Sequence, residues 1–335
     1  MSTASPAHAV PPVRHPWWAV SAVGLATFSV VTTEMLPVGL LTPIAEALGA
    51  STGTAGLMIS LPALLAALFA PVVVIAAGGI DRRRILCALL GLLTVANIAS
   101  ALAPSISWLL AARVLVGFCM GGIWAIAGGL AARLVPAHRV GLATSIIFGG
   151  VAAASVLGVP LGALIGDALG WRCAFAAMAL FSAAILLLQP AVLPALPVAR
   201  SVRPMQFVQQ LGHRGLRQGL WLTLLLVAGH FTAFTYVRPL LTDVSGVQAS
   251  WIGGLLFAYG LAGIVGNFVA GPLAARHPRG VLLAIASGLL LTPLLLLWMG
   301  GTPAGGIAVL LLWGLAYGGV SVGLMSWMTV SYTHL

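Results

Sequence analysis

The first long apolar stretch of the chain is WWAVSAVGLATFSVVTTEMLPVGLL, residues 17–41, and its one charged residue is Glu34. A helix needs about 20 apolar residues to cross the hydrocarbon core of a bilayer. The stretch is long enough to cross, and it is too long for the apolar part of a cleavable signal sequence. Residues 17–41 are therefore predicted to form a membrane-spanning helix that the mature protein keeps.

The rest of the chain has the same composition. Of its 335 residues 61% are hydrophobic and 6% are charged, whereas about a quarter of the residues in soluble domains are charged. A surface with so little charge must mostly face lipid, so an all-α membrane protein is expected. The predicted spans are residues 17–41, 55–79, 85–103, 106–131, 141–165, 173–193, 218–240, 251–274, 281–299 and 305–330.

The longest hydrophilic segment, residues 194–217, follows the sixth predicted span. It holds four arginines and several prolines, which is typical of a linker between domains. The expected organisation is a tail at 1–16, a six-helix bundle at 17–193, the linker at 194–217 and a second bundle at 218–335.

Arginine supplies every basic charge, and the net charge is +10. Twelve arginines fall on one side of the predicted spans, Arg172 and Arg238 fall on the other, and Arg113 lies inside the fourth span. Loops rich in basic residues stay in the cytoplasm, so the N-terminus and the linker are predicted to be cytoplasmic. A nucleic-acid surface is not expected, because no basic stripe with interleaved aromatics is present.

The three cysteines lie in or beside apolar stretches and form no C-x-x-C pair. Their spacing predicts neither a disulfide framework nor a metal site. No metal or cofactor is expected.

The two parts of the chain resemble each other in matching order. TEMLP at 33–37 corresponds to TYVRP at 235–239, the loop at 77–82 to that at 271–276, and the glycines 117, 121 and 122 to the glycines 314, 318 and 319. Parallel repeats of this kind occur in transporters that bind their substrate between two halves. Small residues four apart recur in many helical membrane proteins, but that does not explain the matched Thr, Pro and Arg positions.

Several motifs resemble those of the drug and metabolite:proton antiporters of the major facilitator superfamily. The family's loop motif is approached by Asp81-Arg82-Arg83-Arg84 and again at 271–276, where Ala275 stands in place of Asp. Residues 113–117 and 170–172 are similar to further family motifs, and Gly158-Val159-Pro160-Leu161-Gly162 is similar to the antiporter motif. The resemblance implies twelve spans in two six-helix bundles related by a pseudo-two-fold axis. About ten are found here, so the C-terminal bundle is expected to be truncated. Gating is implied for Asp81, Arg82, Arg84 and Arg276, and a plain topology signal is the alternative for the arginines.

Within that family, residues 34–38, 41–43, 122–125 and 235–239 are most similar to purine ribonucleoside efflux pumps. Sugar efflux and chloramphenicol-resistance relatives share parts of these stretches. The resemblance implies a monomeric, proton-coupled exporter of purine nucleosides or related metabolites and drugs in a bacterial inner membrane. Sugar or chloramphenicol-type efflux and uptake by symport are the alternatives.

Glu34 and Arg113 are the charges placed well inside spans, each about 10 Å from the same side by helical rise. Intramembrane charges are rare and usually functional, so the pair is predicted to couple proton movement to transport. A structural ion pair between the first and fourth spans is the alternative.

Aromatic and polar residues in three spans are the candidates for substrate binding. Met120 and Trp124 share a helical face with Arg113, and Phe234 shares a face with His230, which lies near mid-membrane. Tyr317 is the candidate in the tenth span. Core packing and helix–helix hydrogen bonds are the alternatives for these side chains.

The stretch Gly319-Val320-Ser321-Val322-Gly323 matches the G-x-S-x-G pattern of serine hydrolases. That motif needs a strand-to-helix turn and triad partners. It lies here in an apolar helix, and Ser321 with His230 would have no acid partner, so an enzyme is not expected.

Overall fold

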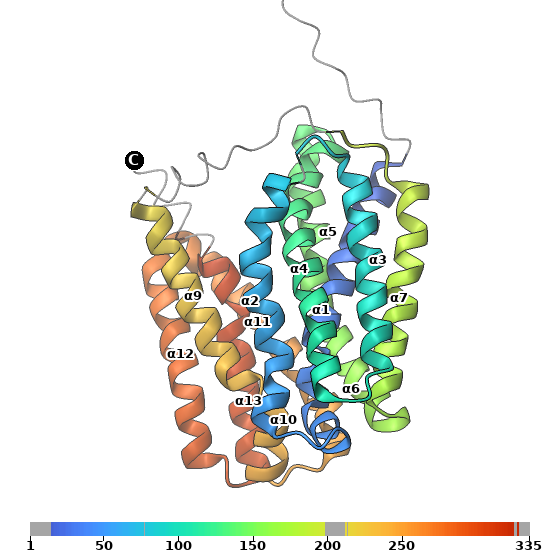
Figure 1. Cartoon of the computed structure of the whole chain (residues 1–335). Coiled ribbons are helices and arrows are strands. Elements are labelled where there is room, and N and C mark those ends of the chain that lie inside the picture. The colour runs from blue at the N-terminus through green and yellow to red at the C-terminus, as the bar shows by residue number, and fades with distance from the viewer. Residues whose placement is uncertain (1–14, 77, 198–211, 213, 325–326, 328–335) are drawn as a thin grey trace, which may run out of the picture.

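The computed structural model describes residues 15–76, 78–197, 212, 214–324 and 327, and every regular element in that part of the chain is helical. Figure 1 shows the helices running alternately up and down in two groups, α1 to α7 and α9 to α13. The helices are α1 Pro16–Ala47, α2 Thr52–Ala76, α3 Arg82–Ala101, α4 Ile106–Leu134, α5 Val140–Ala153, α6 Val159–Leu169, α7 Trp171–Val192, α9 Arg214–Phe234, α10 Val237–Pro239, α11 Ile252–Arg276, α12 Pro278–Met299 and α13 Pro303–Gly318.

Two short π-helical turns modify this plan. The first, η2 at Ala154–Gly158, joins α5 to α6, and the three together make one crossing. The second, η3 at Leu240–Val244, follows α10. Short 3-10 turns precede α5 and α11, at Ala137–Arg139 and Ala249–Trp251.

Within the described residues, nine helices are long and apolar enough to cross a membrane, and ten if the bent pair Arg214–Phe234 and Val237–Val244 is one span. The predicted spans are thereby confirmed, with differences at their ends. The first extends to Ala47. The seventh begins at Arg214, so the last residues assigned to the linker are helical, and it bends by 49° before Val237. Most of the tail, most of the linker and the end of the tenth span lie outside the described residues.

Capping side chains fix where several helices begin. Asp81 accepts a hydrogen bond from the Arg83 N–H at the start of α3, and Ser105 accepts one from Trp108 at the start of α4. Each satisfies an N–H that has no partner within the helix. Gly170, at φ 90°, makes the sharp turn from α6 to α7 in a conformation that side chains disfavour.

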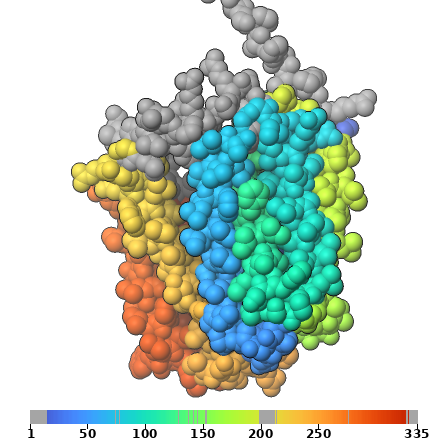
Figure 2. Space-filling model, viewed as in Figure 1, coloured from blue at the N-terminus to red at the C-terminus, as the bar shows by residue number. Residues whose placement is uncertain are grey.

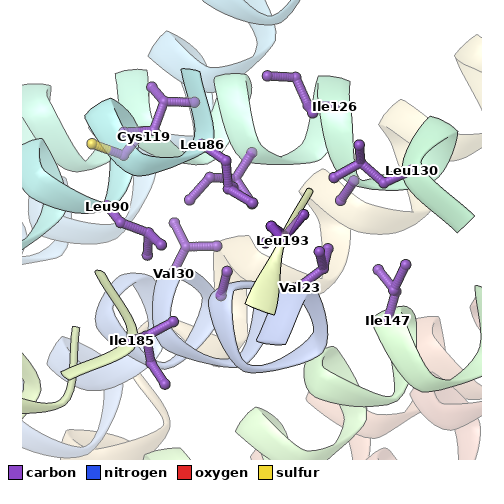
Figure 3. Close-up of a cluster of buried hydrophobic side chains, with 14 of the residues drawn as sticks. Val23, Val30, Leu86, Leu90, Cys119, Ile126, Leu130, Ile147, Ile185 and Leu193 are labelled. Atoms are coloured by element: carbon purple, nitrogen blue, oxygen red, sulfur yellow. The ribbon is translucent and has the colours of Figure 1, made fainter. Parts of the chain in front are cut away.

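The core of the first bundle surrounds α1. Figure 3 shows its buried apolar side chains converging from α1, α3, α4, α5 and α7, with Val23 and Val30 contributed by α1. In the most apolar stretch of α1, 83% of the residues are buried, whereas in that of α7 the share is 33%. The first span is therefore the central helix of this bundle, and the others turn one face to lipid.

The glycine repeat has a packing role in both bundles. A Cβ on Gly117 would lie 2.7 Å from the carbonyl oxygen of Pro62 in α2, and Gly121 approaches α2 in the same way. In the second bundle Gly314 and Gly318 approach the backbone of α11. Span four packs on span two as span ten packs on span eight, which confirms the predicted repeat in three dimensions.

Figure 2 shows the two bundles side by side, with α2 and α9 at their common boundary. One end of the molecule carries the start of α1, the α2–α3 and α4–α5 loops, the end of α7 and the α11–α12 loop (Figure 1). We call it the arginine-rich end, and the opposite end the α10 end. The bundles meet at the α10 end, where α1 and α6 contact α10 and α11.

Arg238 of α10 joins the bundles at this end. Its Nη2 lies 2.8 Å from Asp167 Oδ1 of α6, and its Nη1 donates to the carbonyl of Gly39 in α1. The side chain is 4% exposed. In the sequence Arg238 belongs to the repeated stretch at 235–239 and to the topology signal, and its partners are distant in the chain. In the structure it is a buried link between the bundles.

Candidate substrate and proton site

Glu34 lies on α1 at the boundary between the bundles and is 4% exposed. It is within electrostatic range of Arg113 on α4 and of Tyr317 on α13. The ion pairs within the described residues do not include Glu34. An ionisable side chain buried in a membrane span without a close countercharge is energetically costly, which marks Glu34 as a functional candidate.

Arg113 is fully buried beside the same turn of α1. Its Nη1 donates to the carbonyl oxygen of Thr33 at 2.7 Å, and its guanidinium carbon lies 4.7 Å from the centre of the Phe175 ring. The side chain thus meets the residue next to Glu34 and stacks on an aromatic face of α7. Its Nε and Nη2 find no acceptor among the described residues, so two donors are free to bind another group.

Polar atoms gather around residues 32–34 of α1. Asn97 of α3 donates from Nδ2 to Thr33 Oγ1 at 3.1 Å. Asn97 Oδ1 and Thr32 Oγ1 are buried without a partner among the described residues. Asn97 is not among the residues predicted from the sequence, although an amide inside an apolar span is a recognisable signal. This patch provides unpaired donors and acceptors close to Glu34.

A set of stacked rings occupies the second bundle. His230 of α9 lies parallel to Tyr317 of α13, with ring centres 3.5 Å apart, and to Phe234, at 4.9 Å. Phe234 in turn stacks on Tyr259 of α11 at 4.7 Å. Trp313 of α13 donates from Nε1 to His230 Nδ1 at 3.0 Å. His230 and Phe234 share a face as their spacing predicts. Tyr259 is not among the residues predicted from the sequence, and its hydroxyl is buried without a described partner.

This aromatic set faces the first bundle. Phe234, Tyr259 and Trp313 belong to the same buried cluster as Leu36 of α1 and Phe175 of α7. Phe175 also carries the Arg113 guanidinium. The acid, the arginine and the stacked rings therefore come together at one boundary between the bundles.

Trp124 and Met120 lie elsewhere on α4. Trp124 is 36% exposed, and its ring centre is 5.6 Å from that of Phe148 on α5. Met120 packs against the core of the first bundle. Gly117, which shares their helical face in the sequence, is pressed against α2. The described contacts of Trp124 and Met120 thus stay within the first bundle, away from His230.

The loop that contains Asp81 is hydrogen-bonded to the backbone that follows the end of α7. Asp81 Oδ1 accepts from the backbone N–H of Leu196 at 2.9 Å, and the N–H of Arg82 donates to the Leu196 carbonyl at 3.1 Å. Arg133 donates to the carbonyls of Leu196 and Pro197. Asp81 and Arg82 are therefore brought together with the start of the linker.

Two other residues of the predicted gating motif lie apart from this clamp. Arg84 and Arg276 are both exposed. No hydrogen bond or ion pair within the described part of the chain joins either of them to Asp81.

The residues of the antiporter motif lie where α6 passes between α1 and α11. Gly158 and Gly162 face the side chains of Thr32 and Leu36, and a Cβ on either glycine would overlap them. Pro160 occupies the first turn of α6, directly after the π-helical turn η2. On the other side, Leu164 of α6 packs on Gly253 of α11. The motif glycines thus pack α6 closely on α1 within the first bundle, and Gly253 lets α11 of the second bundle approach α6.

The described residues hold no group of three His, Cys, Asp or Glu side chains placed to bind a metal ion. All three cysteines, Cys87, Cys119 and Cys173, are free thiols.

The chain matches the family model described as Major Facilitator Superfamily over residues 23–334. It therefore belongs to this superfamily and is a multi-pass membrane transporter. Among curated proteins it is similar to the purine ribonucleoside efflux pump NepI of Salmonella paratyphi A, with 34% identity over 318 residues, 95% of this chain and 80% of that protein. NepI of Salmonella typhimurium is 33% identical over the same lengths. The predicted family and the resemblance to purine ribonucleoside efflux pumps are confirmed.

Solved structures share the fold. A bacterial homologue of the human lysosomal transporter Spinster, in an inward-facing and unoccupied conformation, superposes with a TM-score of 0.69 at 16% identity, covering 96% of this chain and 79% of that one. At this identity the likeness concerns the arrangement of the helices.

Proposed function

We propose that the protein exports purine nucleosides or related planar metabolites and drugs in exchange for protons. The observation that carries this proposal is the position of Glu34 and of the stacked rings on opposite sides of one boundary between the bundles. Alternating access in this class of transporter moves the bundles about such a boundary. If the proton site and the substrate site both lie at this boundary, binding of a proton can disfavour binding of the substrate, and the reverse.

The chemistry of the second bundle supports a planar heteroaromatic substrate. Tyr317, His230, Phe234 and Tyr259 stack on one another in that order, so the outer faces of Tyr317 and Tyr259 are the ones left for a planar ligand. Stacking on aromatic side chains contributes about 1–3 kcal/mol per base in proteins that bind single-stranded nucleic acids. Arg113 Nε and Nη2, Asn97 Oδ1 and the patch on α1 supply polar partners for exocyclic groups or ribose hydroxyls. We assign Trp124 and Met120 to the path between this site and the arginine-rich end.

The proton side of the mechanism is assigned to Glu34 with Arg113. Proton binding to Glu34 removes its charge. Arg113 is bound to the carbonyl of the neighbouring residue, Thr33, so its electrostatic interaction with Glu34 changes when Glu34 takes up a proton. Each proton that moves inward releases about 2.3 kcal/mol per 100 mV of membrane potential. Coupling follows if protonated Glu34 and bound substrate favour opposite arrangements of the bundles.

From the positive-inside rule we infer that the arginine-rich end, where α1 begins, and with it the N-terminus, lies in the cytoplasm of a bacterial inner membrane. The α10 end then faces outward and is closed in this structure by Arg238, Asp167 and the tight packing around the antiporter motif. We take one chain to be the transporting unit. We also propose that the hydrogen bond from the Leu196 N–H to Asp81 stabilises the closed state of the arginine-rich end during gating.

Reconstitution in proteoliposomes tests the proposal. Purified protein is supplied with inosine, guanosine, adenosine, chloramphenicol or a sugar, and proton flux is followed with an internal pH dye. The expected result is proton movement that depends on nucleoside and runs opposite to it. Proton flux driven only by sugar or only by chloramphenicol would overturn the substrate assignment, and substrate flux without proton flux would overturn the coupling.

A control pair links the result to the stacked rings. Tyr317→Leu removes the ring at one end of the stack and should weaken nucleoside binding by about tenfold, if one stacking face is worth at least about 1.4 kcal/mol. Phe268→Leu changes a 73% exposed side chain on α11 and should leave binding unchanged.

A further inference from the structure

His230 is held in one orientation by its neighbours. It is 3% exposed, and it lies between the rings of Tyr317 and Phe234, inclined to them by 13° and 23°. Phe231 and Trp313 meet it edge-on. Because rings on both faces restrict rotation about its side-chain bonds, the direction of each ring nitrogen is fixed.

The Trp313 indole decides which of those nitrogens carries the hydrogen. Its Nε1 lies 3.0 Å from His230 Nδ1. An indole N–H can only donate a hydrogen bond, so Nδ1 must be the acceptor and carry no hydrogen. In a neutral imidazole the hydrogen is then on Nε2. Among the described residues none accepts a hydrogen bond from Nε2, so this donor remains free.

We infer that Trp313 is a positioning residue that fixes His230 as the Nε2–H tautomer, so that His230 donates a hydrogen bond to the substrate and does not carry the coupling proton. The inference rests on the proposed function for the identity of the substrate. The acceptor it predicts is a ring nitrogen or carbonyl oxygen of a planar heterocycle that meets the edge of the His230 ring at Nε2. Purine bases offer both kinds of acceptor.

The hydrogen-bond pattern argues against a proton relay at His230. The one nitrogen able to take up a proton is Nδ1, and it already accepts from Trp313. A proton there would face the indole N–H, so that two donors would point at each other. The stacked rings alone would tolerate an imidazolium through cation–π attraction, which leaves Trp313 as the deciding group.

The other titratable and charged groups around His230 are also consistent with substrate binding at His230 and proton binding at Glu34. Tyr317 on α13 and Tyr259 on α11 are phenols, which carry no charge near neutral pH. Glu34 on α1 lies across the boundary, with Arg113 behind it. The carboxylate and the imidazole therefore occupy different bundles, as expected if one binds the proton and the other binds the substrate.

The tautomer can be read directly from the intact protein. Nitrogen NMR on protein with labelled histidine, with His230 assigned by comparison with His230→Gln, should show hydrogen on Nε2 and none on Nδ1 across pH 6 to 8. Trp313→Phe removes the donor and keeps an aromatic ring, and it should allow the hydrogen onto Nδ1. Trp298→Phe, at an 83% exposed position on α12, is the matched control and should leave the tautomer as it is. Hydrogen on Nδ1 in the unmodified protein would overturn the inference.

Two substitutions of His230 separate donation from proton transfer. A glutamine amide can accept from Trp313 through its oxygen and donate through its nitrogen, so His230→Gln should keep inosine affinity. His230→Met, of similar length and without a donor, should weaken inosine binding by about five- to tenfold, the value of one hydrogen bond. Both variants should keep the unmodified ratio of protons to substrate.

Loss of substrate-dependent proton flux in His230→Gln, with binding retained, would make His230 the proton carrier and refute the inference. The tautomer measurement needs neither substrate nor a variant that transports. If the protein binds none of the nucleosides, the proposed function fails, and the nitrogen spectrum still decides the role of Trp313.

Discussion

Arg113 contacts α1 at Thr33, the residue next to Glu34. The two side chains do not form the direct ion pair that their equal depth in the membrane would allow. Arg113 is bound to the carbonyl of Thr33 and to the face of Phe175. A direct salt bridge would satisfy both charges and resist change. The observed arrangement leaves Glu34 able to lose and regain its charge while Arg113 keeps two partners.

Glu34→Gln tests this role, because the amide resembles the protonated acid in size and charge. We expect uphill, pH-dependent nucleoside efflux to fall to the level of liposomes without protein. Equilibrium binding and downhill exchange should partly survive, since the stacked rings are untouched. Transport and proton flux in proteoliposomes are the measurements.

The matched control for this substitution is Glu46→Gln, an exposed acid near the α10 end of the same helix. It should transport and couple as the unmodified protein does. If Glu34→Gln still exchanges protons for substrate at the unmodified ratio, the coupling site lies elsewhere.

At the scale of the helices, glycine decides which elements approach closely. α4 lies on α2 through Gly117 and Gly121, and α13 lies on α11 through Gly314 and Gly318. Lipid provides no hydrophobic force between helices, so close van der Waals contact at small residues is what holds such pairs together. The same property lets α6 fit between α1 and α11.

Gly117→Ala should destabilise the protein by about 1–3 kcal/mol, because the added methyl would meet the backbone of Pro62, which cannot move aside as a flexible side chain can. Gly129→Ala is the control on the same helix, where a Cβ meets no atom within 4 Å. It should be neutral or stabilise by about 0.4–1 kcal/mol. Thermal unfolding in detergent measures both. Equal losses in the two variants would show that the approach to α2 does not set the effect.

Arg238 and Asp167 link two elements that face each other across the bundle boundary. Asp167→Asn leaves a buried guanidinium without its countercharge, which is costly, so the closed α10 end should open more often. We expect faster maleimide labelling from outside of a cysteine introduced at Leu256, which is 2% exposed and packs beside Gly39.

The control for this substitution is Asp243→Asn, an exposed acid at the same end of the molecule. It should not alter the labelling rate at position 256. Unchanged labelling in Asp167→Asn would mean that apolar packing alone closes this end.

At the scale of the whole molecule, charge is sorted to one end. The loops at the arginine-rich end carry the Arg82–Arg84 cluster, Arg133, Arg139, Arg276 and Arg279. Basic residues near span ends resist passage across the membrane. This distribution is expected to fix the orientation of every helix in the membrane.

The two ends of α11 offer a test of that orientation. In a protein without native cysteines, Gln248→Cys precedes α11 and His277→Cys follows it, and both positions are exposed. An impermeant maleimide added to intact cells should label position 248 and leave position 277 unlabelled until the cells are opened. The reverse pattern would place the arginine-rich end outside.

The sequence by itself determined the class of protein, the spans and the repeat. Hydropathy identifies each span because a helix in lipid must satisfy its own backbone and present apolar side chains. The glycine pairs and loop motifs were enough to predict two related bundles and the family. These features are local, so residues close together in the chain encode them.

Only the tertiary structure decided the partners of the polar residues. Arg113 finds an acceptor 80 residues away and Arg238 one 199 residues away. Glu34 and Arg113 have the same predicted depth in the membrane, but depth leaves the rotation of each helix about its axis undetermined. Trp124 and His230, both candidates for substrate binding, lie in separate clusters for the same reason. The rotation and register of each helix depend on how side chains pack between helices. Hydropathy does not predict that packing.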